Sequence, residues 1–289
     1  MCTASAFPPE ELRVSGKINL FLLITGRRPD GYHELATFFM PLPGPCDALA
    51  LAPVPGEGIR VECGAPGIDP QRNTLTRAYR LYAEATGFAP GLGVRLQKGI
   101  PSGAGLGGGS ADGAAILAWM QRHCPRPLEE DVLLALAARV GADVPFFLKG
   151  TPCIAEGIGE KLRPMPSGLE GWSCVLACPP VHVDTSWAYS AWDAERMPFS
   201  LTEWEKIDKN IASRYQCLFG RNDFEAVVFA RWPELYSWKA ALAETGADIA
   251  GMSESGSALY GLFRDGASAV KSVASLREKG TVAYGPFLL

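Results

Sequence analysis

The chain has 289 residues, of which 47% are hydrophobic and 20% charged, so it can bury one large core or two modest ones. We expect two domains. The formal net charge of −4 and the pI near 5.5 argue against nucleic acid as the main partner, because binding a phosphate backbone normally requires a basic face. A local basic patch at Arg27 and Arg28 can still meet a small anionic substrate.

Cysteine usage and the N-terminus indicate the compartment. The eight cysteines are scattered without a CxxC pair, which is typical of reduced thiols in a cytosol, and the three histidines argue against a structural zinc site. The N-terminus lacks a basic segment followed by a long apolar core, and no stretch approaches about 18 consecutive apolar residues. We expect a soluble, unexported, cytoplasmic protein.

Residues 12–24 (LRVSGKINLFLLI) form the first expected strand, with Ile18 and Leu20 on one face and Lys17 and Asn19 on the other. A lysine in such a strand is usually an edge residue whose ammonium reaches water. Asn19 on the same face favours a second interpretation, in which the two side chains form a polar wall beside a ligand.

A turn follows this strand, because Pro29, Asp30 and Gly31 are turn-forming residues. It presents Tyr32 and His33, an aromatic and a histidine that together can cradle a flat ring. The alternative is a partly buried pair that only caps the next strand. Further on, residues 73–74 (Asn-Thr) open a periodic segment, where they can serve simply as a helix N-cap.

The run 101–114 (PSGAGLGGGSADGA) contains six glycines and two serines and leads into an alanine- and leucine-rich helical stretch. Glycine lets backbone amides approach an anion, and the following helix directs its free N–H groups and positive dipole end to the same place. A strand expected at 93–97 and a helix at 114–120 argue against a flexible linker. The run lacks the Gly-Lys-Ser/Thr ending of a P-loop and the distant acidic residue of a dinucleotide fold, so we expect a different class of triphosphate loop.

Asp143 follows a helix expected at 132–140 and ended by Gly141. It precedes Pro145 by two residues, which suits a helix N-cap with proline in the first turn. A capping role is compatible with catalysis.

The second half of the chain begins after the prolines of 163–167, and we place the domain boundary there, giving domains 1–163 and 164–289. We expect a buried strand at 174–178, a loop containing Thr185, Trp187 and Tyr189, and helices near 201–215 and 221–245. A glycine- and serine-rich loop at 252–257, a strand at 258–263, a helix at 266–279 and a final strand complete the chain.

Three of these elements in order, residues 16–35, 100–114 with 141–147, and 252–263, resemble those of the GHMP family of small-molecule kinases. The Lys-Ile-Asn-Leu strand, the Gly-Tyr-His turn and the Ala-Asp-Val-Pro segment resemble the members that phosphorylate a cytidine diphosphate derivative of methylerythritol in the non-mevalonate isoprenoid pathway. The resemblance covers nearly the whole chain, including residues 155–160 and 221–225. It implies an α+β fold with a ribosomal-S5-like N-terminal domain, a ferredoxin-like C-terminal domain and an active site in the cleft between them.

The resemblance also implies roles for individual residues. Lys17 and Asp143 match the family's catalytic pair, in which the lysine keeps the aspartate ionised and offsets charge on the transferring group. Substrate-site positions are Asn19, Tyr32, His33, Thr185 and Tyr189, the tyrosine at 189 stacking on the far side of the cytosine. ATP positions are Asn73, Lys98, Pro101, Gly103, Ala104, Gly105, Leu106, Gly107, Gly108, Gly109 and Ser110. Mg²⁺ would bridge the phosphates with Ser110 as a candidate ligand, and we expect a monomer or weak homodimer.

The third motif departs from the family pattern, because Glu254 stands where a glycine is usual. A backbone bend with positive φ is expected there, so either the loop differs locally or the Glu254 side chain points to solvent. Gly16, Ala111 and Gly113 are smaller departures. Two other functions remain open, a kinase for a different polyol and a nucleotide-binding sensor without activity, although a sensor would normally lack Lys17 or Asp143.

Overall fold

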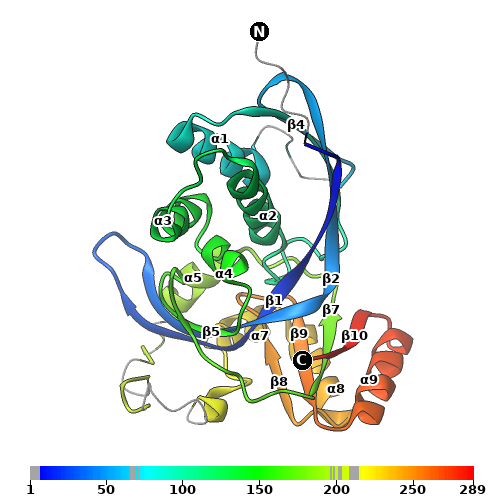
Figure 1. The fold of residues 1–289 in the computed structure, drawn as a ribbon. Coiled ribbons are helices and arrows are strands. Elements are labelled where there is room, and N and C mark those ends of the chain that lie inside the picture. Colours follow the sequence, from blue (N-terminus) through cyan, green and yellow to red (C-terminus); the bar gives the residue numbers. More distant parts are fainter. Residues whose placement is uncertain are drawn as a thin grey trace. The chain divides into compact units, whose positions relative to one another are not determined.

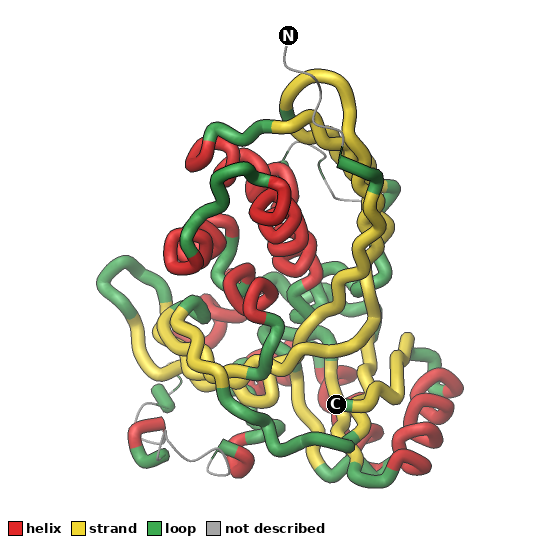
Figure 2. Tube along the Cα trace, in the orientation of Figure 1, coloured by secondary structure: helices red, strands yellow, loops and turns green. Residues whose placement is uncertain are grey.

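A computed structural model of the chain describes residues 7–65, 69, 72–195, 197, 199–200, 204–207 and 215–289. Its mixture of helices and strands confirms the α+β class (Figures 1 and 2). The chain forms two compact units: unit 1 comprises Met1–Gly16, Pro45–Ile100 and Gly107–Gly150, and unit 2 comprises Lys17–Gly44, Pro101–Leu106 and Thr151–Leu289.

Two long strands contribute to both units, namely β1 (Glu10–Arg27) and β2 (His33–Glu57). The division at 163/164 stays a prediction. Arg163 lies in β6 (Lys161–Pro164), which pairs with β5 (Cys153–Gly157). The first two residues of the proline-rich stretch therefore belong to a β-strand.

Unit 1 is a helical layer packed on strands. In it β4 (Pro90–Gln97) pairs in parallel with β3 (Ile59–Cys63) and antiparallel with the second half of β2. Its helices, which cluster on one face of these strands (Figure 1), are α1 (Thr74–Thr86), α2 (Gly108–His123), α3 (Glu130–Val140) and α4 (Val144–Lys149).

The core of unit 1 follows from the helical repeat of its apolar residues. On α1, Leu75, Ala78, Tyr79 and Tyr82 are buried at positions that lie on one face of a helix. They pack with Trp119 and other apolar residues of α2 and with the inward side chains of β2 and β4. This packing fixes the start of α2, whose first turns are formed by the second half of the glycine-rich run.

Unit 2 contains a four-stranded antiparallel sheet in the order β10-β7-β9-β8. Its strands are β7 (Ser173–Cys178), β8 (Ile249–Met252), β9 (Leu259–Phe263) and β10 (Val282–Leu288), and its helices are α5 (Thr185–Ala194), α7 (Glu225–Arg231), α8 (Pro233–Glu244) and α9 (Gly266–Glu278). With α8 and α9 packed against the sheet, this is the β-α-β-β-α-β arrangement of a ferredoxin-like domain (Figure 1).

Three expectations for this half are corrected or limited. The segment containing Thr185 and Tyr189 is the helix α5 and not a loop, because Asp184 caps it by accepting a hydrogen bond from the Trp187 amide at 2.7 Å. The helix expected at 221–245 is two helices, because Pro233 interrupts it. The helix expected near 201–215 lies largely outside the described residues.

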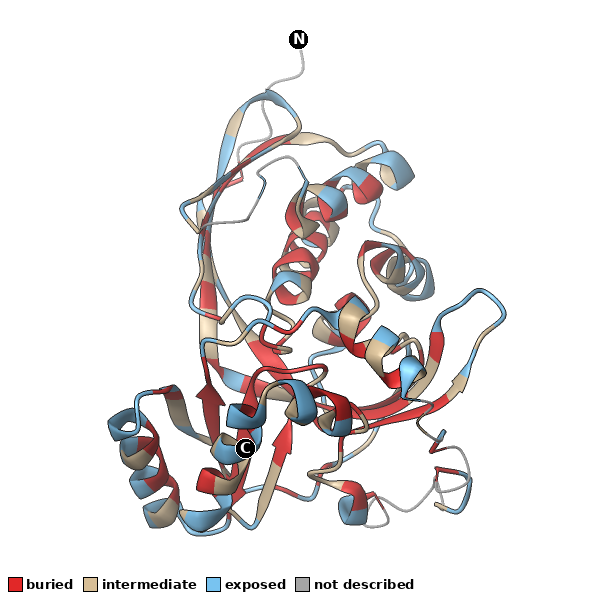
Figure 3. Ribbon diagram, turned by 180° about the vertical axis from the view of Figure 1, so that it is seen from behind, coloured by how far each residue is buried: buried red, intermediate tan, exposed pale blue. Residues whose placement is uncertain are grey.

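Burial follows the same logic in both units. Buried residues concentrate on the strands and on the inner sides of the helices, and exposed residues lie on the outer sides (Figure 3). Within the described residues, every helix is too short or too polar to cross a lipid bilayer.

Candidate active site

The glycine-rich run has the backbone of an anion cradle. Gly103, Gly105 and Gly107 adopt left-handed φ values of 68°, 75° and 70°, which a residue with a side chain rarely adopts. Gly107 is the N-cap of α2, and among the described residues no side chain caps that helix end. The first N–H groups of α2 therefore stay available to a ligand, and the exposed Gly109 lies among them.

The first half of the run, residues 101–106, is held in place by its neighbours in unit 2. The Lys17 amide donates to the Leu106 carbonyl at 2.9 Å, and Ser253 Oγ donates to the Gly105 carbonyl at 2.7 Å. A Cβ atom on Gly105 would lie 2.3 Å from the Ser253 carbonyl oxygen, so only glycine fits. The third motif and β1 therefore shape the loop directly.

Lys17 is fully buried on β1, so the edge-residue interpretation of this lysine is wrong. Its ammonium donates to Asn19 Oδ1 at 2.7 Å, forms an ion pair with Glu254, and lies 4.7 Å from the centre of the Phe39 ring. Asn19 in turn donates to Thr37 on β2 at 2.8 Å. The two side chains therefore form a buried polar pair, and their position beside a ligand stays a prediction.

Both expectations for Glu254 are corrected by this geometry. The loop keeps the left-handed backbone that glycine would give, with φ of 51°, and the side chain turns inward to Lys17 instead of pointing to solvent. Because the ammonium of a buried lysine requires a counter-charge, the carboxylate has an electrostatic reason to point inward.

In unit 1, Lys98 lies between two carboxylates that the sequence analysis did not single out. Its ammonium forms ion pairs with Asp47 and with Asp112, the latter at 2.9 Å, and Asp47 also accepts the Gly99 and Ile100 amides at 2.7 and 2.8 Å. Lys98 is thereby held beneath the first turn of α2. Asp112 could have been singled out from the sequence because it lies within the glycine-rich run, whereas nothing in the local sequence marks Asp47.

Asp112 is an unusual carboxyl group. It is 1% exposed, and its Oδ1 atom has no hydrogen-bond partner among the described residues. Burial raises the pKa of Asp112 to about 7, with the Asp47 carboxylate adding to the shift and the Lys98 ammonium opposing it. The group therefore titrates near neutral pH.

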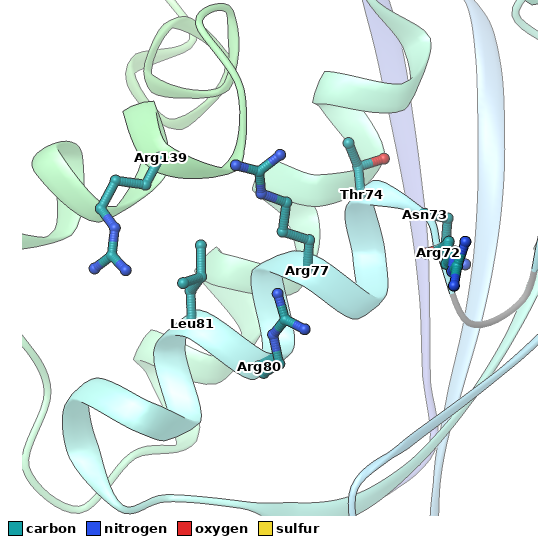
Figure 4. A pocket seen from close by; sticks show the side chains of 7 residues that line it. All are labelled: Arg72, Asn73, Thr74, Arg77, Arg80, Leu81 and Arg139. Carbon is teal, nitrogen blue, oxygen red and sulfur yellow. The ribbon is translucent and has the colours of Figure 1, made fainter.

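Asn73 caps α1, as one interpretation of the sequence predicted. Its Oδ1 atom accepts the Thr76 amide at 2.9 Å, and its Nδ2 group donates to the Asp69 carbonyl at 2.8 Å. It also borders a hollow of about 620 Å³ (Figure 4), whose other lining residues are Arg72, Thr74, Arg77, Arg80, Leu81 and Arg139. Four arginines make this hollow strongly basic despite the negative net charge of the chain.

Asp143 occupies the N-cap position of α4 with Pro145 in the first turn, as expected. Its backbone is helical, with φ of −84° and ψ of −12°, and within the described residues its carboxylate makes no capping hydrogen bond to α4. The preceding turn lies against α2, because a Cβ atom on Gly141 would be 3.8 Å from Ser110 Oγ. The capping explanation therefore does not account for the Asp143 carboxylate.

The Tyr-His turn forms a separate cluster in unit 2. His33 Nε2 lies 2.9 Å from Oδ1 of Asp193, and Oδ2 of the same carboxylate lies 3.3 Å from the Arg27 guanidinium. Tyr32, in contrast, is 62% exposed. The Tyr189 ring stacks on His33 with centroids 4.7 Å apart, which leaves no space for a flat ring between them. Tyr32 offers an exposed aromatic surface that a planar ligand can reach.

Thr185 and His182 lie near the other motifs of unit 2. Thr185 Oγ1 is 2.9 Å from Ser255 Oγ of the third motif. A Cβ atom on Gly103 would be 2.7 Å from His182 Nδ1, so this exposed histidine adjoins the glycine-rich run, a proximity that the sequence did not predict.

Comparisons with known proteins connect these features to a family. Residues 73–151 match the GHMP kinases N terminal domain. A 4-diphosphocytidyl-2-C-methyl-D-erythritol kinase of Nitratidesulfovibrio vulgaris strain Hildenborough is 49% identical over 94% of this chain and 96% of its own. The chain belongs to this kinase family. The kinase of the same name from Solidesulfovibrio magneticus is 46% identical, and the match covers 96% of this chain and 97% of the other.

Solved structures agree with this membership. A crystal structure of 4-(cytidine 5'-diphospho)-2C-methyl-D-erythritol kinase aligns with a TM-score of 0.78 at 35% identity, covering 96% of this chain and 98% of the other. Homoserine kinase from Cytophaga hutchinsonii aligns with a TM-score of 0.70 at 16% identity, covering 100% and 98%, which shows the shared GHMP kinase fold alone. The protein is a small-molecule kinase, a phosphotransferase that uses ATP.

Proposed function

We propose that the protein transfers the γ-phosphoryl group of ATP to the 2-hydroxyl of 4-diphosphocytidyl-2-C-methyl-D-erythritol, giving the 2-phosphate and ADP in the non-mevalonate route to isopentenyl diphosphate. The observation that carries the proposal is nearly full-length identity of 46–49% to kinases bearing that substrate's name. The glycine-rich run, the buried Lys17 and the Tyr-His turn support it, since each supplies chemistry that this reaction needs.

The glycine-rich run and α2 would bind the ATP phosphates. Amides of the first turn of α2 would donate to phosphate oxygens, and the third N–H group of the Lys98 ammonium, whose charge Asp47 and Asp112 offset, would donate to them as well. The basic hollow beside Asn73 would favour the approach of a polyanion to unit 1. We infer that Asn73 acts mainly by fixing the start of α1, and that it thereby fixes the position of the arginines that line the basic hollow.

The substrate hydroxyl is a tertiary alcohol, which is a weak nucleophile at neutral pH. Asp143 would accept its hydrogen bond and direct its oxygen at the γ-phosphorus, so that an O–P bond forms as the bond to the ADP oxygen breaks. Phosphoryl transfer has a loose transition state, so orientation by Asp143 matters more than early deprotonation. Lys17 would offset negative charge on the transferring group.

Mg²⁺ would bind where oxygen donors meet the phosphates. Ser110 Oγ, in the first turn of α2, is a hard oxygen donor of the kind Mg²⁺ takes, and it lies against the turn that carries Asp143. The ion would neutralise charge on the β- and γ-phosphates when bound.

The Tyr-His turn would recognise the cytosine. Tyr32 offers an exposed ring for stacking, and Asp193 fixes the orientation of His33, which can then exchange hydrogen bonds with the base. Since Tyr189 already packs on His33, its role would be to support that histidine, with Thr185 and Asn19 on neighbouring parts of the substrate site.

We also propose a cytoplasmic monomer or weak homodimer that acts on small molecules and not on nucleic acid.

ATP consumption tests the proposal against the other polyol kinases. Purified protein is assayed with 4-diphosphocytidyl-2-C-methyl-D-erythritol, mevalonate and homoserine, because a homoserine kinase and a mevalonate kinase share the fold. We expect turnover with the cytidine compound only, and inhibition by free CDP. Turnover with mevalonate or homoserine, or none with the cytidine compound, would contradict the proposed substrate.

A further inference from the structure

The third motif contains a carboxylate at a position where its backbone conformation favours glycine. We propose that Glu254 is a positioning residue that holds the Lys17 ammonium in its working orientation through its negative charge. The inference rests on the proposed function, because it concerns how Lys17 serves phosphoryl transfer.

The backbone at Glu254 is the first argument. It is the one residue other than glycine with positive φ in the described part of the chain, at 51°. Glutamate gains nothing from that conformation, and such residues persist where the surrounding structure imposes them, commonly at functional sites. A purely structural loop would favour glycine here.

The second argument is that the backbone of this motif is firmly anchored. The Asn222 side-chain amide donates to the carbonyls of Met252 and Glu254 at 2.8 and 2.7 Å. Ser253 Oγ donates to the Gly105 carbonyl and lies 3.2 Å from Asn19 Oδ1. Residue 254 is therefore fixed relative both to β1 and to the glycine-rich run, so its carboxylate extends from a rigid support.

The third argument is electrostatic. Lys17 is fully buried, and Glu254 is a charged partner of its ammonium, so the Glu254 carboxylate contributes to offsetting the cost of burying that charge. The Glu254 side chain is 27% exposed and the Lys17 side chain is fully buried, so one end of the ion pair is reached by solvent. That end lies beside the glycine-rich run, because a Cβ atom on Gly105 would be 3.2 Å from Glu254 Cβ. With this charge removed, the ammonium would keep Asn19 but lose a directional partner.

A misplaced catalytic group costs rate more than binding, because a shift of about 1 Å can reduce turnover roughly 100-fold. We therefore expect loss of the Glu254 charge to lower kcat while KM for ATP and for the cytidine substrate change little. A carboxylate that instead competes with phosphate for Lys17 would, when removed, lower KM for ATP.

Two substitutions form a matched pair for the test. Glu254→Asp and Glu254→Asn have side chains of equal size, and both residues tolerate left-handed backbone, so they differ essentially in charge. We expect Glu254→Asn to lose about 10–100-fold in kcat and Glu254→Asp to retain most of it. Glu254→Gly relieves the backbone strain, and we expect the same loss of kcat. Urea unfolding verifies that each variant is folded.

Three outcomes would overturn the proposal: equal kcat for the Asp and Asn variants, wild-type kcat for Glu254→Gly, or a lower KM for ATP without the carboxylate. The proton and nitrogen NMR signals of the Lys17 ammonium give a readout that needs no substrate. We expect them to shift in Glu254→Asn and return towards wild type in Glu254→Asp.

If wild-type protein fails to phosphorylate the cytidine compound, the proposed function fails, and unchanged ammonium signals would separately refute the role of Glu254.

Discussion

Two glycines of α2 allow the phosphate-binding role of its first turn to be separated from helix stability. Gly109 lies in the first turn and is exposed, and Gly113 follows four residues later on the same helix. A Cβ atom on Gly109 would meet nothing closer than Thr74 Oγ1 at 3.5 Å, and one on Gly113 nothing closer than Thr74 Cβ at 3.4 Å. Alanine therefore fits at either position with ordinary contacts.

The two substitutions should have the same effect on stability but different effects on ATP binding. Alanine in place of glycine within a helix adds about 0.5–1 kcal/mol to the free energy of unfolding. Every Cα–Cβ bond in a helix tilts towards its N-terminus, so a methyl group on Gly109 would project towards an anion at the start of α2. At Gly113 the methyl group would lie against α1 instead.

Calorimetry with a non-hydrolysable ATP analogue and urea unfolding measure the two quantities. We expect Gly109→Ala to weaken binding at least tenfold, or about 1.4 kcal/mol, while its unfolding free energy equals or exceeds that of wild type. Gly113→Ala should gain the same stability and bind the analogue normally. If Gly109→Ala binds the analogue as well as Gly113→Ala does, the amides of the first turn do not hold the phosphates.

Three further predictions concern the charged and aromatic groups. Because the folded-state pKa of Asp112, about 7, lies above its unfolded value of about 3.9, wild-type stability declines as pH rises between these values and then levels off. The unfolding free energy of Asp112→Asn relative to wild type should thus increase from pH 5 to pH 8 in urea titrations, and a constant difference would show that the group does not titrate there. Tyr32→Ala should raise KM for the cytidine substrate at least tenfold with KM for ATP unchanged in steady-state assays, and an equal rise of both would assign Tyr32 to the fold. Asp193→Asn should raise the same KM severalfold by loosening His33, with wild-type thermal stability, whereas an unchanged KM would remove the pair from base recognition.

Local chemistry made much of this fold predictable. The strand through Lys17, the glycine-rich run, the N-cap of α1 and the helix before Gly141 follow from periodicity and from residues with strong backbone preferences. The structure confirms each of them, because the deciding signal lies within a few residues of the element that it predicts.

The missed features depend on contacts between distant segments. The Lys17–Glu254 ion pair joins residues 237 positions apart, and Lys98 meets Asp47 across 51 positions, so no window of sequence contains both partners. The helix α5 was missed for a local reason, since its capping Asp184 follows a loop-like stretch and its aromatic residues suggested a ligand-binding loop.

Phosphorus NMR detects the product of the proposed phosphoryl transfer directly. Wild-type protein and Asp143→Asn are each incubated with ATP, Mg²⁺ and 4-diphosphocytidyl-2-C-methyl-D-erythritol, after calorimetry has shown that both bind the ATP analogue. We predict a new phosphomonoester signal and ADP with the wild-type protein, and loss of nearly all of that signal with the variant. A folded wild-type protein that forms no phosphomonoester, or a variant that forms it at the wild-type rate, would contradict the account.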